Sequence, residues 1–542
     1  MSHLVNSLDA VVTEALDALV AASGGALARL DGYPDTKVVV RADWTGDRVA
    51  VVSGGGAGHE PAHAGFVGGG MLTAAVSGDI FASPGVDAVL AAIVAVTGEA
   101  GCLVVVKNYT GDRLNFGLAV ERARGRGLDV TMVVVGDDVA LPDAAQPRGL
   151  AGTLLVHKVA GALAERGEDL ATVTAAAAKV AGSVRSLGVS LTAVQIPGRP
   201  GEDRIGDGTV ELGMGIHGEP GARTVDLTGA TALVHDMAAT LAGSVPDGPV
   251  ALLVNDLGGL SSLETQIVLH DLLGSPLGAR VELVVGPAAL MTSLSARGMS
   301  VSALPLDPEL VAALGDPVAG HTAWPGARRP GEVTLLPLPD LGAEVSAPSE
   351  DPGVRSLLDA VCHALVGHQA DLDALDARVG DGDTGSTFAG AARRVREELD
   401  ALPLADTPAL LGSLSRLLSS AMGGSSGVLG SILLAAAGTA AANGSTVADA
   451  LHEGVLAVQH HGGAAPGDRT MLDALVPAVQ TLREGGSLRD AAEAAEQGAA
   501  ATADMTSTTV GRSAYVPTAH LTGNQDPGAA AVAIMLRAAA DA

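Results

Sequence analysis

The sequence predicts a two-part protein, an α/β domain followed by an all-helical domain. Residues 1–328 alternate short β-branched apolar runs with Ala- and Leu-rich stretches of helical character, which is the pattern of an α/β domain with a largely parallel or mixed sheet. Strand signals nearly vanish in residues 354–542, where Ala- and Leu-rich helical segments are broken by glycine clusters. Between them, five prolines and a lack of helical periodicity predict a linker over residues 329–353.

The strands of the first domain are expected where short apolar runs are followed by glycine-rich turns. After each turn comes a helix-like segment, so strands and helices alternate along this part of the chain. The expected strands lie, in order, within residues 37–42, 49–55, 101–109, 128–136, 250–259 and 280–286.

The composition excludes several classes of protein. Although 47% of the residues are hydrophobic and the mean hydropathy is +0.35, no apolar run approaches the roughly 18 residues that span a bilayer. The formal net charge of −29 repels nucleic acid and anionic lipid. The first 22 residues do not have the pattern of a secretory signal, and two cysteines are too few for a disulfide framework. We therefore expect a cytoplasmic protein with no membrane or nucleic-acid partner.

The first motif is SGGGAGHEPAH, residues 53–63, directly after an expected strand. Its glycines let the backbone turn tightly and approach a ligand, and His59 and His63 stand where a strand ends, which is the usual place for sites in α/β proteins. The alternative is an ordinary strand–turn–helix loop with a surface histidine.

The second motif is KNYTGDRLNF, residues 107–116, again after an apolar run. Asp112 in a loop at the end of a strand is either a helix N-cap or a general base. The third motif, ELGMGIHGEPG at residues 211–221, brackets His217 with glycines. Such a histidine is accessible to a small ligand as a nucleophile, an acid or base, or a metal ligand, unless it is simply a turn residue.

The fourth motif is LDARVGDGDTGST, residues 375–387, in the helical domain. Its glycines permit a turn that folds the carboxylates of Asp376, Asp381 and Asp383 toward one point. Three converging carboxylates need a hard cation, and Mg²⁺ bound in this way typically also holds substrate phosphates. An acidic, solvated turn is the alternative.

The fifth motif is MGGSSGVLG, residues 422–430, at the start of an expected helix. Glycine amides and serine hydroxyls at a helix N-terminus form an anion cradle, whereas a glycine patch for helix packing is the alternative. Two later segments belong with it, GDRTMLDAL at 467–475 and GRSAYVPTAHLTGNQDPGAA at 511–530. Arg512 can neutralise a phosphate, and the DPG sequence caps the last helix.

Together these motifs resemble the fused dihydroxyacetone kinase family, and they occur in that family's order over nearly the whole chain. The segments GLAGTLLVHKVAGALAERG (149–167) and LLVNDLGGLSSLE (252–264) add to the resemblance. It implies a substrate domain of two α/β subdomains over residues 1–328, and a nucleotide domain over 354–542 built as an antiparallel eight-helix barrel.

The resemblance also implies roles for individual residues of the first domain. A ketone substrate would be held as a covalent hemiaminal on His217, because an imidazole adds to a carbonyl. Asp112 would accept the proton of the attacking hydroxyl, and His59 would hydrogen-bond or protonate a substrate oxygen. Gly55, Gly56 and Lys107 match the surrounding substrate loop.

In the second domain, the resemblance implies an ATP site with two Mg²⁺ ions held by Asp376, Asp381 and Asp383. The phosphates would lie against the glycine- and serine-rich motif, and three later segments would line the nucleotide pocket. The implied nucleotide-binding residues are Gly423, Gly424, Ser425, Ser426, Gly427, Thr470, Met471, Arg512, Asp526, Pro527 and Gly528.

The expected activity is therefore phosphorylation of the terminal hydroxyl of a short ketose by ATP, with dihydroxyacetone first. Residues 313–330 and the C-terminal segment look closer to relatives that act on four-carbon ketoses, so erythrulose is the alternative substrate. Two other readings stay open, a lyase that converts FAD to cyclic FMN and a non-catalytic regulator. A homodimer is expected from the family.

Overall fold

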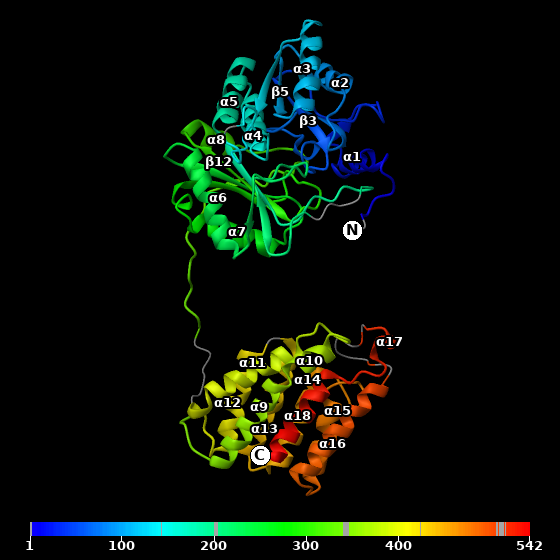
Figure 1. Cartoon of the computed structure of the whole chain (residues 1–542), viewed down its shortest axis with the longest axis vertical. Helices are drawn as coiled ribbons and strands as arrows, with labels where there is room; N and C mark the ends of the chain where they lie inside the picture. Colours follow the sequence, from blue (N-terminus) through cyan, green and yellow to red (C-terminus); the bar gives the residue numbers. More distant parts are fainter. Residues whose placement is uncertain are drawn as a thin grey trace. The chain divides into compact units, whose positions relative to one another are not determined.

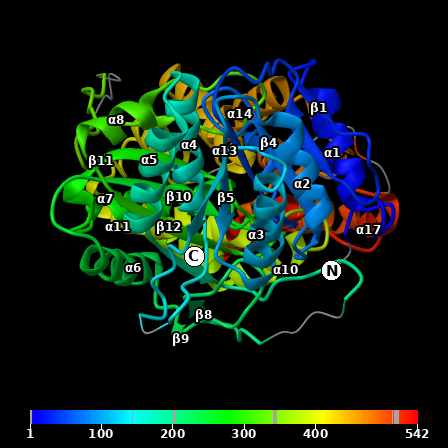
Figure 2. The same cartoon turned by 90° about the horizontal axis from the view of Figure 1, so that it is seen from above.

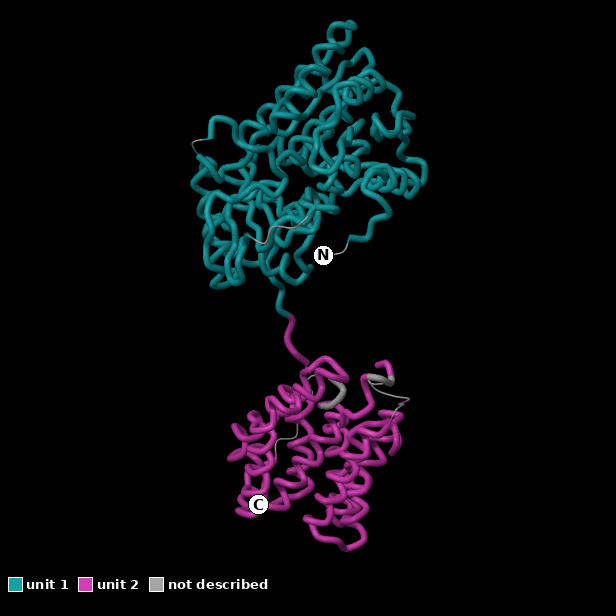
Figure 3. The backbone as a smooth tube through the Cα atoms, turned by 45° about the vertical axis from the view of Figure 1, so that its right-hand side comes forward, with its two compact units in different colours: residues 1–335 teal, residues 336–542 magenta. Residues whose placement is uncertain are grey.

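The computed structural model describes residues 3–142, 144–199, 204–339, 346–422, 424–505, 508, 514 and 516–542, and only the backbone at 424–426, 518 and 519. The chain divides into two compact units, Met1–Leu335 and Leu336–Ala542 (Figure 3). The first unit contains both strands and helices, and the second is helical, so the predicted fold class is confirmed.

The first unit contains two sheets, and the first of them carries much of the candidate site. Its strand order is β1-β2-β4-β3-β5-β6, with β3, β4, β5 and β6 parallel and β1 and β2 antiparallel to their neighbours. The strands are β1 (Leu27–Arg29), β2 (Val38–Arg41), β3 (Ala50–Ala57), β4 (Ala74–Ile80), β5 (Cys102–Lys107) and β6 (Val130–Val135). The helices of this half are α1 (Val11–Ala22), α2 (Val86–Val96), α3 (Thr110–Arg124), α4 (Thr153–Glu165) and α5 (Leu170–Ser183).

The second sheet is mixed, with the order β13-β11-β10-β12-β7-β8-β9, and only β10 and β11 pair in parallel among its described strands. The strands are β7 (Arg185–Ser190), β8 (Thr209–Leu212), β9 (Arg223–Asp226), β10 (Val250–Asp256), β11 (Val281–Ala288), β12 (Gly298–Pro305) and β13 (Ala327–Arg328). The helices are α6 (Ala230–Ser244), α7 (Ser262–Gly274) and α8 (Pro308–Gly315).

One continuous hydrophobic core joins the two halves of this unit. It includes Val51 and Val105 of the first sheet, Leu253 and Val285 of the second, and most of α4. Helix α4 is buried along nearly its whole length and lies beside α5 (Figures 1 and 2). Burying a leucine or valine side chain contributes roughly 1.5–3 kcal/mol, so this core holds the two sheets in a fixed relation.

In the described residues of the second unit, eight long helices form a ring. Around the ring, α9, α11, α12, α13, α14, α15, α16 and α18 each pack against the next, and α18 packs against α9 to close it. The helices of this unit are α9 (Pro352–Gly367), α10 (Gln369–Asp376), α11 (Thr384–Glu397), α12 (Thr407–Ala421), α13 (Gly424–Ala442), α14 (Val447–Gly462), α15 (Leu472–Arg483), α16 (Leu488–Ala501), α17 (Thr518–Leu521) and α18 (Pro527–Asp541). From α11 to α16 the connections are short, so these sequential helices run antiparallel. With the match to a solved kinase structure over the whole chain, the predicted eight-helix barrel is confirmed.

Candidate active site

The residues predicted for the first unit come from the ends of strands. His59 follows β3, Lys107 is the last residue of β5, and Asp112 lies in the first turn of α3. His217 lies in the loop after β8 of the other sheet. The carboxyl ends of adjacent parallel strands meet at one edge of a sheet, and the shared core brings the second sheet to that edge.

Three aromatic rings surround the imidazole of His217. The ring of Tyr109 lies with its centroid 4.4 Å away at an interplanar angle of 88°, and Phe81 lies at 5.3 Å. His59 lies at 4.8 Å, so the two predicted catalytic histidines are neighbours. The side chain of His217 is 20% exposed, which keeps it within reach of a small ligand while its neighbours restrict its orientation.

A loop of the second sheet holds His59 in place. The Nδ1 atom of His59 lies 2.8 Å from the carbonyl oxygen of Thr292, and the carbonyl oxygen of His59 accepts the backbone N–H of Thr292. Because a carbonyl only accepts, Nδ1 of His59 carries the proton and Nε2 bears the lone pair. Burial, with the charges of Lys107 and His217, holds the pKa of His59 well below its ordinary value. Nε2 of His59 has no hydrogen-bond partner among the described residues, so it is suited to accept a hydrogen bond from a ligand.

Lys107, Asp112 and His63 converge on Gly55. A Cβ atom on Gly55 would lie 2.8 Å from Nζ of Lys107, 3.6 Å from Oδ2 of Asp112 and 3.7 Å from Nε2 of His63. Burial lowers the pKa of Lys107, although the charges of Asp112, Asp137 and Glu60 oppose that effect. The absent side chain of Gly55 therefore leaves a small space walled by a cation, a carboxylate and an imidazole.

Gly56 contacts a different part of the chain from Gly55. A Cβ atom there would lie 2.7 Å from the backbone nitrogen of Ala82, so Gly56 packs against the segment that carries Phe81. This close backbone contact explains why the residue at position 56 is glycine.

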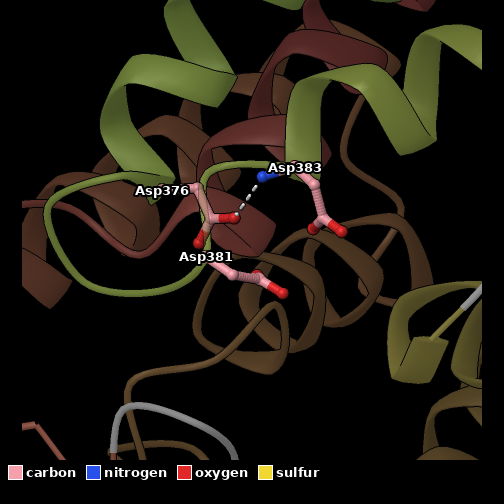
Figure 4. Close-up of side chains that lie close together, drawn as sticks. All are labelled: Asp376, Asp381 and Asp383. Atoms are coloured by element: carbon pink, nitrogen blue, oxygen red, sulfur yellow. Dashed lines mark hydrogen bonds between the residues drawn. The ribbon is translucent and has the colours of Figure 1, made fainter. Parts of the chain in front are cut away.

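In the second unit, the three predicted metal-site aspartates lie together (Figure 4). One carboxylate oxygen from each of Asp376, Asp381 and Asp383 lies within 4.8 Å of the others. Asp376 is buried, and its Oδ2 accepts the backbone N–H groups of Gly382, Asp383 and Thr384, which fold the loop around it. Asp381 and Asp383 are exposed.

This cluster fits magnesium. Mg²⁺ prefers oxygen ligands at about 2.1 Å, so opposite ligands are about 4.2 Å apart, only slightly less than the spread of these carboxylates. Oδ1 of Asp376 is left for a cation because its Oδ2 is engaged by the loop amides. All three donors are hard carboxylate oxygens, which suit Mg²⁺ better than a softer metal.

Several predicted nucleotide-site residues lie on adjoining loops. A Cβ atom on Gly528 would lie 3.5 Å from Cβ of Met471 and 3.1 Å from Oδ2 of Asp526. Asp526 caps α18 by accepting the backbone N–H of Ala529, and Pro527 follows it in the first turn. The backbone N–H of Thr470 donates to Asp473.

Asn524 ties these loops to the loop of the carboxylate cluster. Its side-chain oxygen accepts from Arg378, and its backbone carbonyl accepts from Arg469 at 2.7 Å. Arg378 lies between Asp376 and Asp381 in the sequence. The segments 376–383, 469–471 and 524–528 are therefore neighbours at one end of the barrel.

The predicted anion cradle is only partly described. Gly423 and Arg512 lie outside the described residues, while Gly424, Ser425, Ser426 and Gly427 form the first turn of α13. A Cβ atom on Gly427 would lie 2.4 Å from Cβ of Met422, so this glycine allows close packing of the helix start.

Four residues around His217 and His59 were not predicted from the sequence. Glu219 and Tyr109 lie within the third and second motifs, and an acidic residue two positions after a glycine-bracketed histidine is the signal for Glu219. Phe81 and Thr292 carry no such signal, because they reach the site only through the fold.

In the part of the chain that the structure describes, every helix is too short or too polar to span a bilayer.

The α/β unit carries an accessible histidine and the helical unit carries a carboxylate cluster, an arrangement that suits a small-molecule phosphotransferase of two units. The Dak1 domain model matches residues 19–322 and the DAK2 domain model matches residues 378–541. The chain belongs to the dihydroxyacetone kinase family.

Relatives match over nearly their whole length. The chain is 46% identical to the dihydroxyacetone kinase of Citrobacter freundii, over 98% of this chain and 97% of the relative. It is 42% identical to human triokinase/FMN cyclase (99% and 98%) and 34% identical to the L-erythrulose 1-kinase of Mycolicibacterium smegmatis (99% and 99%). The crystal structure of the C. freundii kinase with AMP-PNP and Mg²⁺ matches with a TM-score of 0.73 and 45% identity, covering 100% of this chain and 99% of the other.

Proposed function

We propose that this protein transfers the γ-phosphoryl group of ATP to the terminal hydroxyl of a short ketose, dihydroxyacetone first, held as a hemiaminal on His217. The observation that carries the proposal is the position of His217, accessible between glycines and beside His59. A ketone carbonyl is the electrophile that an imidazole can capture, whereas glycerol has no carbonyl and would be rejected.

The neighbouring residues support the transfer step. Asp112, buried beside the space above Gly55, takes the proton as the substrate hydroxyl oxygen bonds to the γ-phosphorus and the bond to ADP breaks. Lys107 adds positive charge at the same place, and neutral His59 accepts a hydrogen bond from the substrate. Gly55 provides the room, and Gly56 holds the loop against Phe81.

The nucleotide belongs to the second unit in this proposal. Asp376, Asp381 and Asp383 would hold Mg²⁺, which neutralises phosphate charge when bound. The first turn of α13 and the segments around Met471 and Gly528 would contact the nucleotide, with Arg512 and Gly423 proposed from the sequence alone. The proposed division is a ketose domain at 1–328, a linker at 329–353 and a nucleotide domain at 354–542, close to the two compact units.

The test is ADP release with Mg²⁺ and ATP against dihydroxyacetone, D- and L-erythrulose, glyceraldehyde and glycerol, using the wild type and H217A. We expect turnover of carbonyl compounds, inert glycerol and a weakened response in H217A. Turnover of glycerol, or indifference to the H217A change, would contradict the hemiaminal kinase.

Erythrulose is the second candidate substrate, because a relative that is 34% identical over the whole chain is an L-erythrulose 1-kinase. The same panel ranks the two ketoses by kcat/KM. Adding FAD without a ketose tests the cyclase alternative, which would survive the H217A change. We also propose a cytoplasmic homodimer, which the family resemblance supports, and light scattering of the purified protein tests the dimer.

A further inference from the structure

We propose that Glu219 is a positioning residue for His217: it fixes which ring nitrogen attacks the ketone and balances the charge that the ring gains. The inference rests on the proposed function and deepens it, because it concerns how the same site captures a carbonyl.

Glu219 holds both the backbone and the ring of His217. Its Oε2 accepts the backbone N–H of His217 at 3.0 Å, and its Oε1 lies 3.3 Å from Nδ1 of the ring. Burial raises the pKa of Glu219, but its hydrogen bonds with the ring and the backbone N–H of His217 outweigh that effect, and the pKa is lowered to about 2. The carboxylate is therefore ionised at neutral pH and acts only as an acceptor.

The state of Glu219 decides the tautomer of His217. A carboxylate can face Nδ1 only if Nδ1 carries a proton, so the lone pair of the neutral ring is placed on Nε2. The edges and faces of Tyr109, Phe81 and His59 restrict the other directions in which the ring could turn. Nε2 is then the nucleophile, already formed before the substrate arrives.

The negative charge of Glu219 matters because the addition step creates a positive charge on the ring of His217. The Nε2 lone pair forms the new C–N bond, and the π pair of the carbonyl moves onto its oxygen, which takes a proton from the solvent. The imidazole thereby becomes a cation with its proton still on Nδ1. The carboxylate beside Nδ1 stabilises this cation, so it favours the adduct over the free ketone.

The fold maintains the position of this carboxylate. A Cβ atom on Gly215 would lie 2.4 Å from Oε2 of Glu219, so the glycine makes room for it. Arg148 donates to the carbonyl oxygen of Gly213, and Arg204 pairs with Glu211 and reaches the carbonyl oxygen of Glu219 at 3.4 Å. The loop is therefore tied at its beginning and at Glu219 itself.

The test separates adduct formation from phosphoryl transfer. The full-length protein is titrated with [2-13C]dihydroxyacetone without ATP, and the conversion of the carbonyl signal to that of a tetrahedral carbon is followed by NMR. We expect E219Q to weaken adduct formation about tenfold, E219D to restore part of it, and H217A to abolish it. In ADP release, E219Q should raise KM for the ketose about tenfold, with kcat and the KM for ATP within about threefold.

The matched control is E211Q, which removes a carboxylate of the same segment that pairs with Arg204 and not with His217. If E219Q and E211Q weakened adduct formation equally, Glu219 would only hold the loop in place, and the inference would be wrong. Unchanged adduct formation in E219Q would also overturn it. Because E219Q is isosteric, its melting temperature should stay close to that of the wild type. A wild type that forms no adduct and releases no ADP would instead refute the proposed function itself.

Discussion

Nζ of Lys107 lies 2.7 Å from Nε2 of His63, with both side chains buried. A protonated lysine amine has only donors, so Nε2 of His63 is the acceptor and its proton is on Nδ1. Burial holds the pKa of His63 well below its ordinary value, and the Lys107 charge adds to this effect. A neutral imidazole therefore orients the amine of Lys107 without adding a second charge beside it.

Replacing His63 by leucine should impair catalysis more than folding. Losing a hydrogen bond to a buried charged group costs about 1.5–3 kcal/mol, so we expect kcat to fall roughly 10- to 100-fold as Lys107 loses its orientation. H63Q keeps an acceptor and should recover part of kcat. Steady-state kinetics with thermal unfolding of both variants checks this, and equal kcat in H63L and the wild type would contradict it.

Replacing Gly55 by alanine should fill the space between Lys107 and Asp112. The added Cβ would lie 2.8 Å from Nζ of Lys107, so we expect kcat/KM for the ketose to fall by on the order of 100-fold. G229A, at the residue before helix α6, is the matched control, since its φ of 147° is close to the 157° of Gly55 and a Cβ there meets nothing within 4 Å. Steady-state kinetics of the two variants measures this effect. Similar kcat/KM values for both would show that the substrate does not use the space.

Replacing Asp381 by asparagine should raise the Mg²⁺ concentration needed for half-maximal ADP release, by about tenfold. The change removes one charge from the cluster while the loop keeps its hydrogen bonds to Asp376. D371N, an exposed aspartate on the preceding helix α10, is the control. A magnesium titration of activity measures the effect, and an equal shift in D371N would indicate a general loss of negative charge.

Replacing Asp526 by asparagine should stabilise the second unit at neutral pH. Burial raises the pKa of Asp526 to about 6, although the Ala529 amide and Arg469 oppose this. The native state therefore binds a proton that the unfolded chain has lost between about pH 4 and 6, so wild-type stability falls as the pH rises through this range. Asparagine keeps the helix cap and carries no charge.

We expect D526N to raise the free energy of unfolding by about 1–3 kcal/mol at pH 7.5, with the gain disappearing below about pH 4. Urea unfolding followed by circular dichroism at several pH values measures it. A gain that is the same at every pH would mean that charge burial is not its cause.

The strand pattern predicted some strands and not others, for a physical reason. Six apolar segments rich in valine became β2, β3, β5, β6, β10 and β11, whereas β4, β7 and β12 are rich in glycine, serine and alanine. A Cβ on Gly78 would lie 1.9 Å from a backbone oxygen of Ala82, and one on Gly298 would lie 2.3 Å from that of Val189. These strands are buried where neighbours approach too closely for larger side chains, so they lack a β-branched signal.

Prediction of the site residues from the sequence was limited in a similar way. Motifs located His59, Lys107, Asp112 and the aspartate cluster because glycines and polar groups at strand or helix ends are local features. Thr292, which holds His59, is 233 residues away from it in the sequence, and no local pattern marks it. Contacts that only the tertiary fold creates cannot be found from spacing along one chain.

The helices of the second unit form a closed ring, so the first and last helices of the chain are packed on both sides like all the others. Since α18 packs between α16 and α9, every long helix has two neighbours, and the chain could be opened at another loop without exposing a new apolar face. A circular permutant that joins α18 to α9 by a flexible linker and begins at Ser445, between α13 and α14, should therefore keep the barrel. The order of synthesis would change while the carboxylate loop stayed intact.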